Sequence, residues 1–247
     1  MSNKTTFVSF LLDETGSMQS IKDDTVGGFN AYLDTLKKGG DSILFSLVSF
    51  NSSKTLKRYV AEPVTTIQPL SEDDYQPHAM TPLIDAAVKI ITATDEAVSQ
   101  RTDEPNVVIV MQTDGMENVS VEYTTTDLAL LIKEKEAAGW QFVFLGAGLD
   151  AFAAAREAGI VIDASRVVSY DRQMSHEVFA ATAANVEEYA RSGDEKNLVF
   201  SHAQRAQVGD KYTDQYLDAT APETTPPKKK RVEKKDRRSS TVDDIKL

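Results

Sequence analysis

Apolar runs that end at an acidic residue alternate with helical patterns along this chain, and this alternation restricts its fold more than any other feature. Residues 7–12 form one such run, which ends at Asp13, and residues 107–112 form another, which leads into Thr113 and Asp114. An uninterrupted apolar run is typical of a strand buried on both faces, and strands that alternate with helices form a parallel sheet. The sequence therefore predicts an α/β fold with a Rossmann-like, doubly wound, mostly parallel central sheet and helices on both faces.

The other expected elements follow from periodicity and from turn residues. Residues 55–60 are expected to form one antiparallel edge strand, joined as a hairpin to a strand at 42–50. Pro82 suits the first turn of a helix, and Thr126 is expected to cap a helix that runs to about residue 138. Apolar spacing predicts further helices at 18–38 and 177–191, and further strands at 140–145 and 167–170.

Oxygen-bearing side chains follow the first apolar run. Asp13, Thr15 and Ser17 alternate along a turn, and Gly16 carries no side chain that would crowd an approaching group. Hard divalent cations such as Mg²⁺ prefer oxygen ligands of this kind. The same residue types also cap helices, so these residues alone leave a helix N-cap as an alternative.

Two further segments favour the metal interpretation. Thr81 precedes a proline, and Thr113-Asp114-Gly115 ends the second apolar run. In order and spacing, these motifs together with Asp13-x-Thr15-x-Ser17 resemble the metal-ion-dependent adhesion site of the von Willebrand factor type A family. The resemblance implies that one divalent cation, Mg²⁺ or alternatively Mn²⁺, is held by Asp13, Thr15, Ser17, Thr81 and Asp114. It also implies one open coordination position for an acidic residue of a partner protein.

Thr15 departs from the family pattern, in which serine is commoner, but threonine keeps the hydroxyl ligand. The residues would converge if the strands at 7–12 and 107–112 are neighbours, because ligands of open parallel sheets bind where the winding direction reverses. Asp13 and Asp114 would then lie close together. Two adjacent carboxylates require either a cation or a raised pKa.

Charge and composition restrict the location and the partners. The chain carries a net charge of −11, whereas residues 226–247 contain nine Lys or Arg and four Asp or Glu. The remaining acidic body disfavours nucleic acid and membranes, and any nucleic-acid contact is expected to be weak and made by the basic tail. Without cysteine, a signal-peptide pattern or a long apolar stretch, we expect a cytoplasmic protein.

Three regions are expected along the chain: a domain at 1–192, a partly ordered extension at 193–221 and a disordered basic tail at 222–247. Within the tail, residues 226–232 resemble a nuclear-import signal, although a solubilising role is favoured. Residues 142–150, with Tyr170 downstream, resemble a bacterial and phage-encoded subgroup of the family.

The expected function is a binding module, without enzymatic activity, that recruits a protein through a metal-bound Asp or Glu. The resemblance suggests a partner such as an ATPase or a large assembly. One alternative is a structural or assembly protein, for example of a phage, with a non-essential metal site. Another is a metal hydrolase with Glu14 or Glu117 as the general base. A nucleotide site at Gly146-x-Gly148 is disfavoured because the rest of that motif is missing, and His78 is expected to be solvated.

Overall fold

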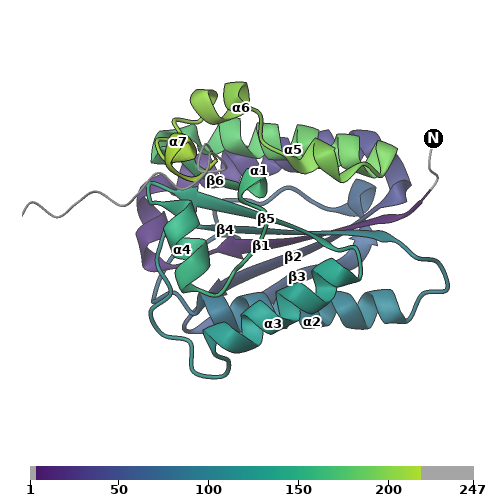
Figure 1. Cartoon of the computed structure of the whole chain (residues 1–247), viewed down its shortest axis with the longest axis horizontal. Coiled ribbons are helices and arrows are strands. Elements are labelled where there is room, and N and C mark those ends of the chain that lie inside the picture. Colours follow the sequence, from purple (N-terminus) through teal and green to yellow (C-terminus); the bar gives the residue numbers. More distant parts are fainter. Residues whose placement is uncertain (1–3, 218–247) are drawn as a thin grey trace, which may run out of the picture.

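One twisted sheet lies between two layers of helices (Figure 1). The computed structural model describes residues 4–217. Its six strands are ordered β3-β2-β1-β4-β5-β6, and the winding reverses between β1 and β4. All neighbouring strands are parallel except β2 and β3. The doubly wound fold with one antiparallel edge strand is therefore confirmed. The strands span Thr6–Asp13 (β1), Ile43–Asn51 (β2), Lys54–Pro63 (β3), Asn106–Thr113 (β4), Gln141–Ala147 (β5) and Val167–Tyr170 (β6).

The central strand β1 is aligned with a parallel neighbour on each side up to its carboxyl end. Leu12 aligns with Gln112 of β4 on one side and with Ser49 of β2 on the other. All eight residues of β1 are buried, because helices cover both faces of the sheet. The carboxyl ends of β1 and β4 consequently lie side by side.

The two helical layers bury separate apolar cores. The helices α1 (Lys22–Leu36) and α5 (Ser175–Ser192) cover one face, where aromatic rings pack at centroid distances of 5.2–6.4 Å. The helices α2 (Leu83–Ser99), α3 (Thr125–Ala137) and α4 (Ala151–Glu157) cover the other face (Figure 1). Short 3-10 turns lie at Gly16–Ile21 (η1), Lys37–Ser42 (η2), Val64–Thr66 (η3), Ala164–Arg166 (η4), Arg172–Met174 (η5) and Glu195–Leu198 (η6).

Two expected helix boundaries were wrong. The cap of α3 is Thr124 and not Thr126, because Thr124 and Asp127 exchange hydrogen bonds in a capping box. The helix expected at 18–38 is interrupted: η1 precedes α1, which ends at Leu36. Thr124 and Asp127 have the spacing that a capping box requires, so the sequence contained the signal for a cap at Thr124.

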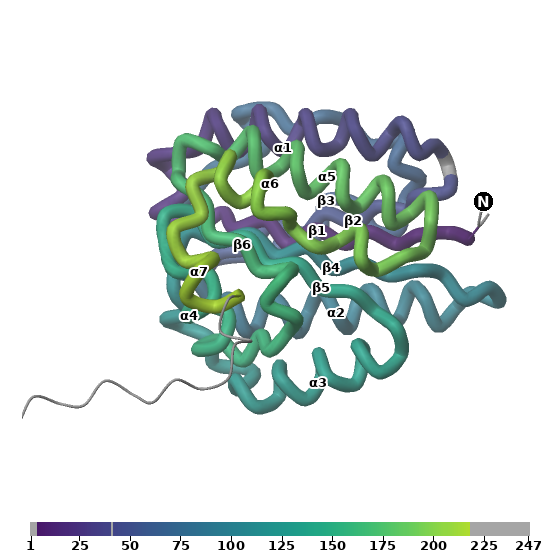
Figure 2. The backbone as a smooth tube through the Cα atoms, turned by 45° about the horizontal axis from the view of Figure 1, so that its top comes forward, coloured from purple at the N-terminus to yellow at the C-terminus, as the bar shows by residue number. Residues whose placement is uncertain are grey.

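Residues 193–217 continue on the same body. They include η6 and the short helix α6 (His202–Gln207), which lie beside α5, and the short helix α7 (Thr213–Tyr216), which lies near α4 (Figure 2). The ring of Tyr216 stacks on Phe152 at 4.5 Å between centroids. The division into a domain and an extension stays a prediction, and the tail expected at 222–247 lies outside the described residues.

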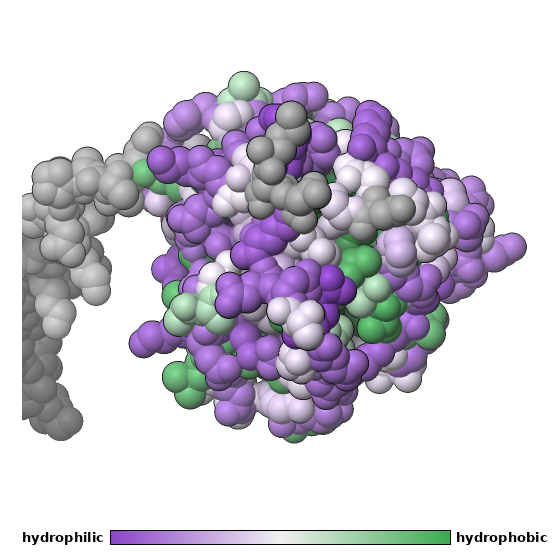
Figure 3. Space-filling view, turned by 90° about the vertical axis from the view of Figure 1, so that its right-hand side faces the viewer, coloured by the Kyte–Doolittle hydropathy of each residue, from purple (hydrophilic) through white to green (hydrophobic). Residues whose placement is uncertain are grey.

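On the side where the chain begins, hydrophilic residues cover most of the surface and hydrophobic ones form only a small group (Figure 3). Between residues 4 and 217, none of the helices combines the length and the apolar character that crossing a membrane requires.

Candidate metal centre

The five predicted ligands gather at the edge of the sheet where the winding reverses. Asp13 is the last residue of β1, and Asp114 directly follows the neighbouring strand β4. Both side chains lie at the carboxyl ends of parallel strands, where open α/β sheets bind their ligands.

Asp13 is fully buried and held in one orientation. Its Oδ1 atom accepts a hydrogen bond from the backbone N–H of Thr15 at 2.7 Å, and its Oδ2 atom accepts one from the hydroxyl of Thr113 at 2.5 Å. The hydroxyl of Tyr75 donates to the backbone carbonyl of Asp13. Burial raises the pKa of Asp13 to about 6 against these lowering hydrogen bonds, and the nearby charge of Asp114 raises it further.

The two hydroxyls of the first loop link the two carboxylates. The Oγ1 atom of Thr15 lies 3.2 Å from Oγ of Ser17, and Ser17 donates a hydrogen bond of 2.5 Å to Oδ1 of Asp114. Thr15 stands at the N-cap position of η1, but its side chain makes no capping hydrogen bond. The structure therefore does not support the alternative in which Thr15 serves as a helix cap.

Thr81 reaches the cluster from a third loop. Its backbone N–H donates to the side chain of Asn118 at 3.1 Å, and its carbonyl accepts from the N–H of Asn118 at 3.2 Å. A Cβ atom on Gly115 would lie 3.2 Å from Oγ1 of Thr81 and 3.8 Å from Oγ of Ser17. These two hydroxyls therefore flank the small space that Gly115 leaves open. The structure brings all five predicted side chains together.

Glu14 holds the loops around the cluster. Its carboxylate is buried, accepts from the N–H of Gln76 at 2.8 Å, and lies 3.3 Å from Nζ of Lys54 and 3.4 Å from Nη2 of Arg58. Burial alone would raise the pKa of Glu14, but its hydrogen bonds and the charge of Lys54 hold the pKa below its usual value. This anchoring role was missed in the sequence, because Lys54 and Arg58 are distant from Glu14 along the chain.

Glu117 organises the start of α2. It accepts hydrogen bonds of 2.7–2.8 Å from the N–H groups of Ile84, Val119 and Ser120, and another from the hydroxyl of Ser120. Both oxygens of this carboxylate are engaged, as are both oxygens of Glu14. The structure thus gives the two candidate general bases a role in positioning loops. His78 contacts the carbonyl of Gln76 at 2.7 Å.

Arg172 is a further residue of the site that the motifs did not reveal. Its Nη2 atom lies 2.8 Å from Oδ2 of Asp114. Burial raises the pKa of Asp114, while the hydrogen bond from Ser17 and the charge of Arg172 lower it in part. The available sequence signal was the position of Arg172 in the turn after the edge strand β6, at the same edge of the sheet as Asp114.

The donor set fits a hard divalent cation. It consists of two carboxylates and three hydroxyls, all oxygen donors, at a place where buried negative charge needs compensation. In the part of the chain that the structure describes, no group of three or more His, Cys, Asp or Glu side chains could hold a metal, so a cation at this cluster would depend on the hydroxyls beside the two carboxylates.

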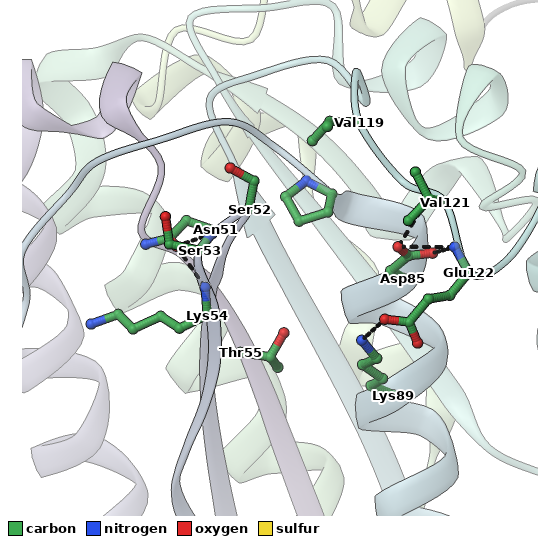
Figure 4. A pocket seen from close by; sticks show the side chains of 11 residues that line it. Asn51, Ser52, Ser53, Lys54, Thr55, Asp85, Lys89, Val119, Val121 and Glu122 are labelled. Carbon is green, nitrogen blue, oxygen red and sulfur yellow. Dashed lines mark hydrogen bonds and ion pairs between the residues drawn. The ribbon is translucent and has the colours of Figure 1, made fainter.

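A hollow of about 400 Å³ lies next to the cluster, between the β2–β3 turn and the start of α2 (Figure 4). The charged side chains that line it already have partners. Asp85 accepts from the N–H groups of Val121 and Glu122 at 3.0 and 3.1 Å, and Lys89 pairs with Glu122 at 2.6 Å. None of the five clustered side chains lines this hollow.

The comparisons with solved structures agree with the topology. A von Willebrand factor type A protein from Catenulispora acidiphila matches with a TM-score of 0.51 and 14% identity, covering 74% of this chain and 43% of the other. The fold is that of a von Willebrand factor type A domain. The resemblance seen in the sequence is thus confirmed for the fold, whereas the bacterial and phage subgroup stays a prediction.

Two other proteins share this von Willebrand factor type A fold. The pilus adhesin SpaC from Lactobacillus rhamnosus GG matches with a TM-score of 0.54 and 12% identity, covering 79% of this chain and 31% of the adhesin. Proximal thread matrix protein 1 from the mussel byssus matches with a TM-score of 0.50 and 13% identity, covering 73% of this chain and 45% of that protein. Another structure of the byssus protein has zinc in its metal-ion-dependent adhesion site (MIDAS) motif. It matches with a TM-score of 0.50 and 14% identity, covering 73% of this chain and 46% of that one.

This chain spans less than half the length of each of these proteins. No family model matches the sequence, and no curated protein matches it.

Proposed function

We propose that this domain binds a divalent cation through Asp13, Thr15, Ser17, Thr81 and Asp114 and thereby recruits a partner protein. The supporting observation is the convergence of these five oxygen-bearing side chains from three loops at one edge of the sheet. When bound, the cation supplies positive charge and a coordination position for an Asp or Glu of the partner. Mg²⁺ is the proposed ion, and the same oxygen ligands can also bind Mn²⁺.

The surrounding residues prepare the ligands for this task. Thr113 and the backbone of Thr15 orient the carboxylate of Asp13, and Ser17 orients that of Asp114. The buried carboxylate of Asp13 is held by a hydroxyl and a backbone N–H, which do not offset its charge, so this side of the cluster favours a cation over water. An adhesin and a matrix protein among the structural neighbours support a binding role over a catalytic one.

Titration of the full chain with Mg²⁺ or Mn²⁺ tests the metal site directly. We expect isothermal titration calorimetry to show one site in the wild type and a loss of affinity of at least roughly 100-fold in Asp114→Ala, because a charged ligand is removed. Asp73→Ala is the matched control, since Asp73 is an exposed carboxylate on a loop preceding Thr81. Undiminished uptake by Asp114→Ala and by Asp13→Ala would contradict the proposal.

The metal-dependent recruitment of a partner protein is tested separately. A pull-down in Mg²⁺ should retain a protein that is lost in EDTA and that Asp114→Ala fails to retain. We propose that this partner is an ATPase or a component of a large assembly, which mass spectrometry of the retained protein would decide. A partner that stays bound in EDTA would instead support the second candidate, a structural or assembly protein whose metal site is not needed for contact.

A further inference from the structure

A guanidinium group connects two of the loops that form the metal cluster. Arg172 begins η5, and its Nη2 atom lies 2.8 Å from Oδ2 of Asp114. Its Nη1 atom donates to Oγ of Ser20 at 2.8 Å and lies 3.5 Å from the backbone carbonyl of Ser17. The arginine thus bridges the loop after β1 and the loop after β4.

The contact places a positive charge on a carboxylate that a metal would need. The side chain of Asp114 is fully buried, and its other oxygen already accepts the hydrogen bond from Ser17. A divalent cation and a guanidinium on the same carboxylate would repel each other strongly at such short range. Occupation of Asp114 by one of them therefore disfavours the other.

The backbone of η5 is held in place, whereas the end of the arginine side chain is partly free. The N–H of Asp171 donates to the carbonyl of Val208 at 2.9 Å, and Lys211 pairs with the carboxylate of Asp171 at 2.9 Å. The side chain of Arg172, by contrast, is 38% exposed. Exchange of its partner thus requires rotation of the side chain and no unfolding.

The neighbouring strand leaves room for the arginine. Gly148, just after β5, has a φ of 68°, and a Cβ atom there would lie 2.9 Å from both Cγ and Nε of Arg172. A residue larger than glycine would therefore push the arginine from its present path. The contact with Asp114 depends on this close approach.

We propose that Arg172 is a built-in competitor of the divalent cation for Asp114, so that metal uptake must displace its guanidinium. This inference rests on the proposed metal site. Its consequence is that the five oxygen ligands bind the cation more weakly than they would without the arginine. The domain then takes up metal only above a concentration threshold that Arg172 sets.

Calorimetric titration of the full chain with Mg²⁺ tests the competition. Arg172→Gln should bind Mg²⁺ about fivefold more tightly than the wild type, since roughly that factor corresponds to one ion pair with a partly exposed arginine. Arg172→Lys should lie between the two, because lysine keeps the charge but lacks the fork that reaches both Asp114 and Ser20. Lys211→Gln removes the same charge from the neighbouring Asp171 and should bind like the wild type.

Thermal unfolding in EDTA gives a second readout. Arg172→Gln should unfold at a lower temperature than the wild type, because Asp114 loses its partner, and Mg²⁺ should then raise its midpoint more than that of the wild type.

Equal Mg²⁺ affinities for the wild type and Arg172→Gln would overturn the competition and leave the metal site intact. If Lys211→Gln gained as much Mg²⁺ affinity as Arg172→Gln, the gain would come from removing any nearby positive charge. That result would also overturn the competition for Asp114. Absence of uptake in every variant and in the wild type would overturn the metal site together with this inference.

Discussion

Replacing Asp13 with asparagine should abolish Mg²⁺ binding and, in EDTA at pH 8, raise the free energy of unfolding by about 2 kcal/mol. Asp13 is fully buried, and its pKa rises from 3.8 to about 6 on folding. A shift of this size corresponds to roughly 3 kcal/mol against the ionised carboxylate in the folded protein. Asparagine removes that cost, although its single amide oxygen can accept only one of the two hydrogen bonds that Thr15 and Thr113 donate to the carboxylate.

The sign of the pH dependence follows from the direction of the shift. Between about pH 4 and pH 6 the folded protein binds more protons at Asp13 than the unfolded chain does. The contribution of this group to stability is therefore greatest at low pH and is lost as the pH rises to 6. Urea denaturation at a series of pH values in EDTA should show this slope in the wild type and not in Asp13→Asn.

The matched control for this prediction is Asp73→Asn, which should keep both the slope and the Mg²⁺ affinity of the wild type. Addition of Mg²⁺ at 100 times its dissociation constant should stabilise the wild type by about 2.7 kcal/mol and leave Asp13→Asn unchanged. A lower stability of Asp13→Asn than of the wild type throughout the range from pH 6 to pH 8 would contradict the argument that ionised Asp13 is costly.

Replacing Arg205 with methionine should cause a large loss of stability, about 3–5 kcal/mol. Arg205 is only 1% exposed, and its Nη1 atom donates to the carboxylate of Asp210 and to the carbonyl of Val167, both at 2.8 Å. Its Nη2 atom donates to the carbonyl of Ser165 at 2.8 Å. Methionine would leave a buried carboxylate and several buried carbonyls without their donor. Chemical denaturation in urea measures the loss.

Two further variants distinguish the loss of the buried Arg205–Asp210 ion pair from the effect of removing any arginine. Arg191→Met should change stability little, because Arg191 is 60% exposed and pairs with Glu188 at the surface. The double variant Arg205→Met with Asp210→Leu should recover part of the lost stability, since no unpaired charge then remains. A loss in Arg205→Met as small as that in Arg191→Met would contradict a structural role for the buried arginine.

Local patterns were sufficient for the strands and for the set of side chains that cluster at the sheet edge. The apolar runs at 7–12 and 107–112 correspond to β1 and β4, and the edge strand expected at 55–60 is β3. The clustered side chains could be predicted because each follows a strand or precedes a helix, and such positions share one edge of a parallel sheet. Helix ends were less reliable: the cap at Thr124 was missed because threonines at 124–126 offer the same hydroxyl at successive positions.

Contacts between distant segments could not be read from those patterns. Arg172 reaches Asp114 from the turn after the edge strand β6, and Arg205 reaches the backbone carbonyls of residues 164–167 from α6. A long cationic side chain after a strand is ordinarily solvated, so its sequence neighbourhood carries no sign of a buried partner. Only the packing of the edge strand β6 and the segment after α5 against the rest of the sheet brings these charges together.

The sequence alone determined the kind of sheet, the polar residues at the ends of its central strands and the oxygen-bearing side chains of the cluster, because periodicity and residue chemistry are local properties. Only the tertiary structure decided which charges meet: a buried Asp13 with a raised pKa, a Glu14 held by Lys54 and Arg58, and Arg172 seated on Asp114. The reason is that burial and electrostatic pairing depend on distances between residues that the chain itself places far apart.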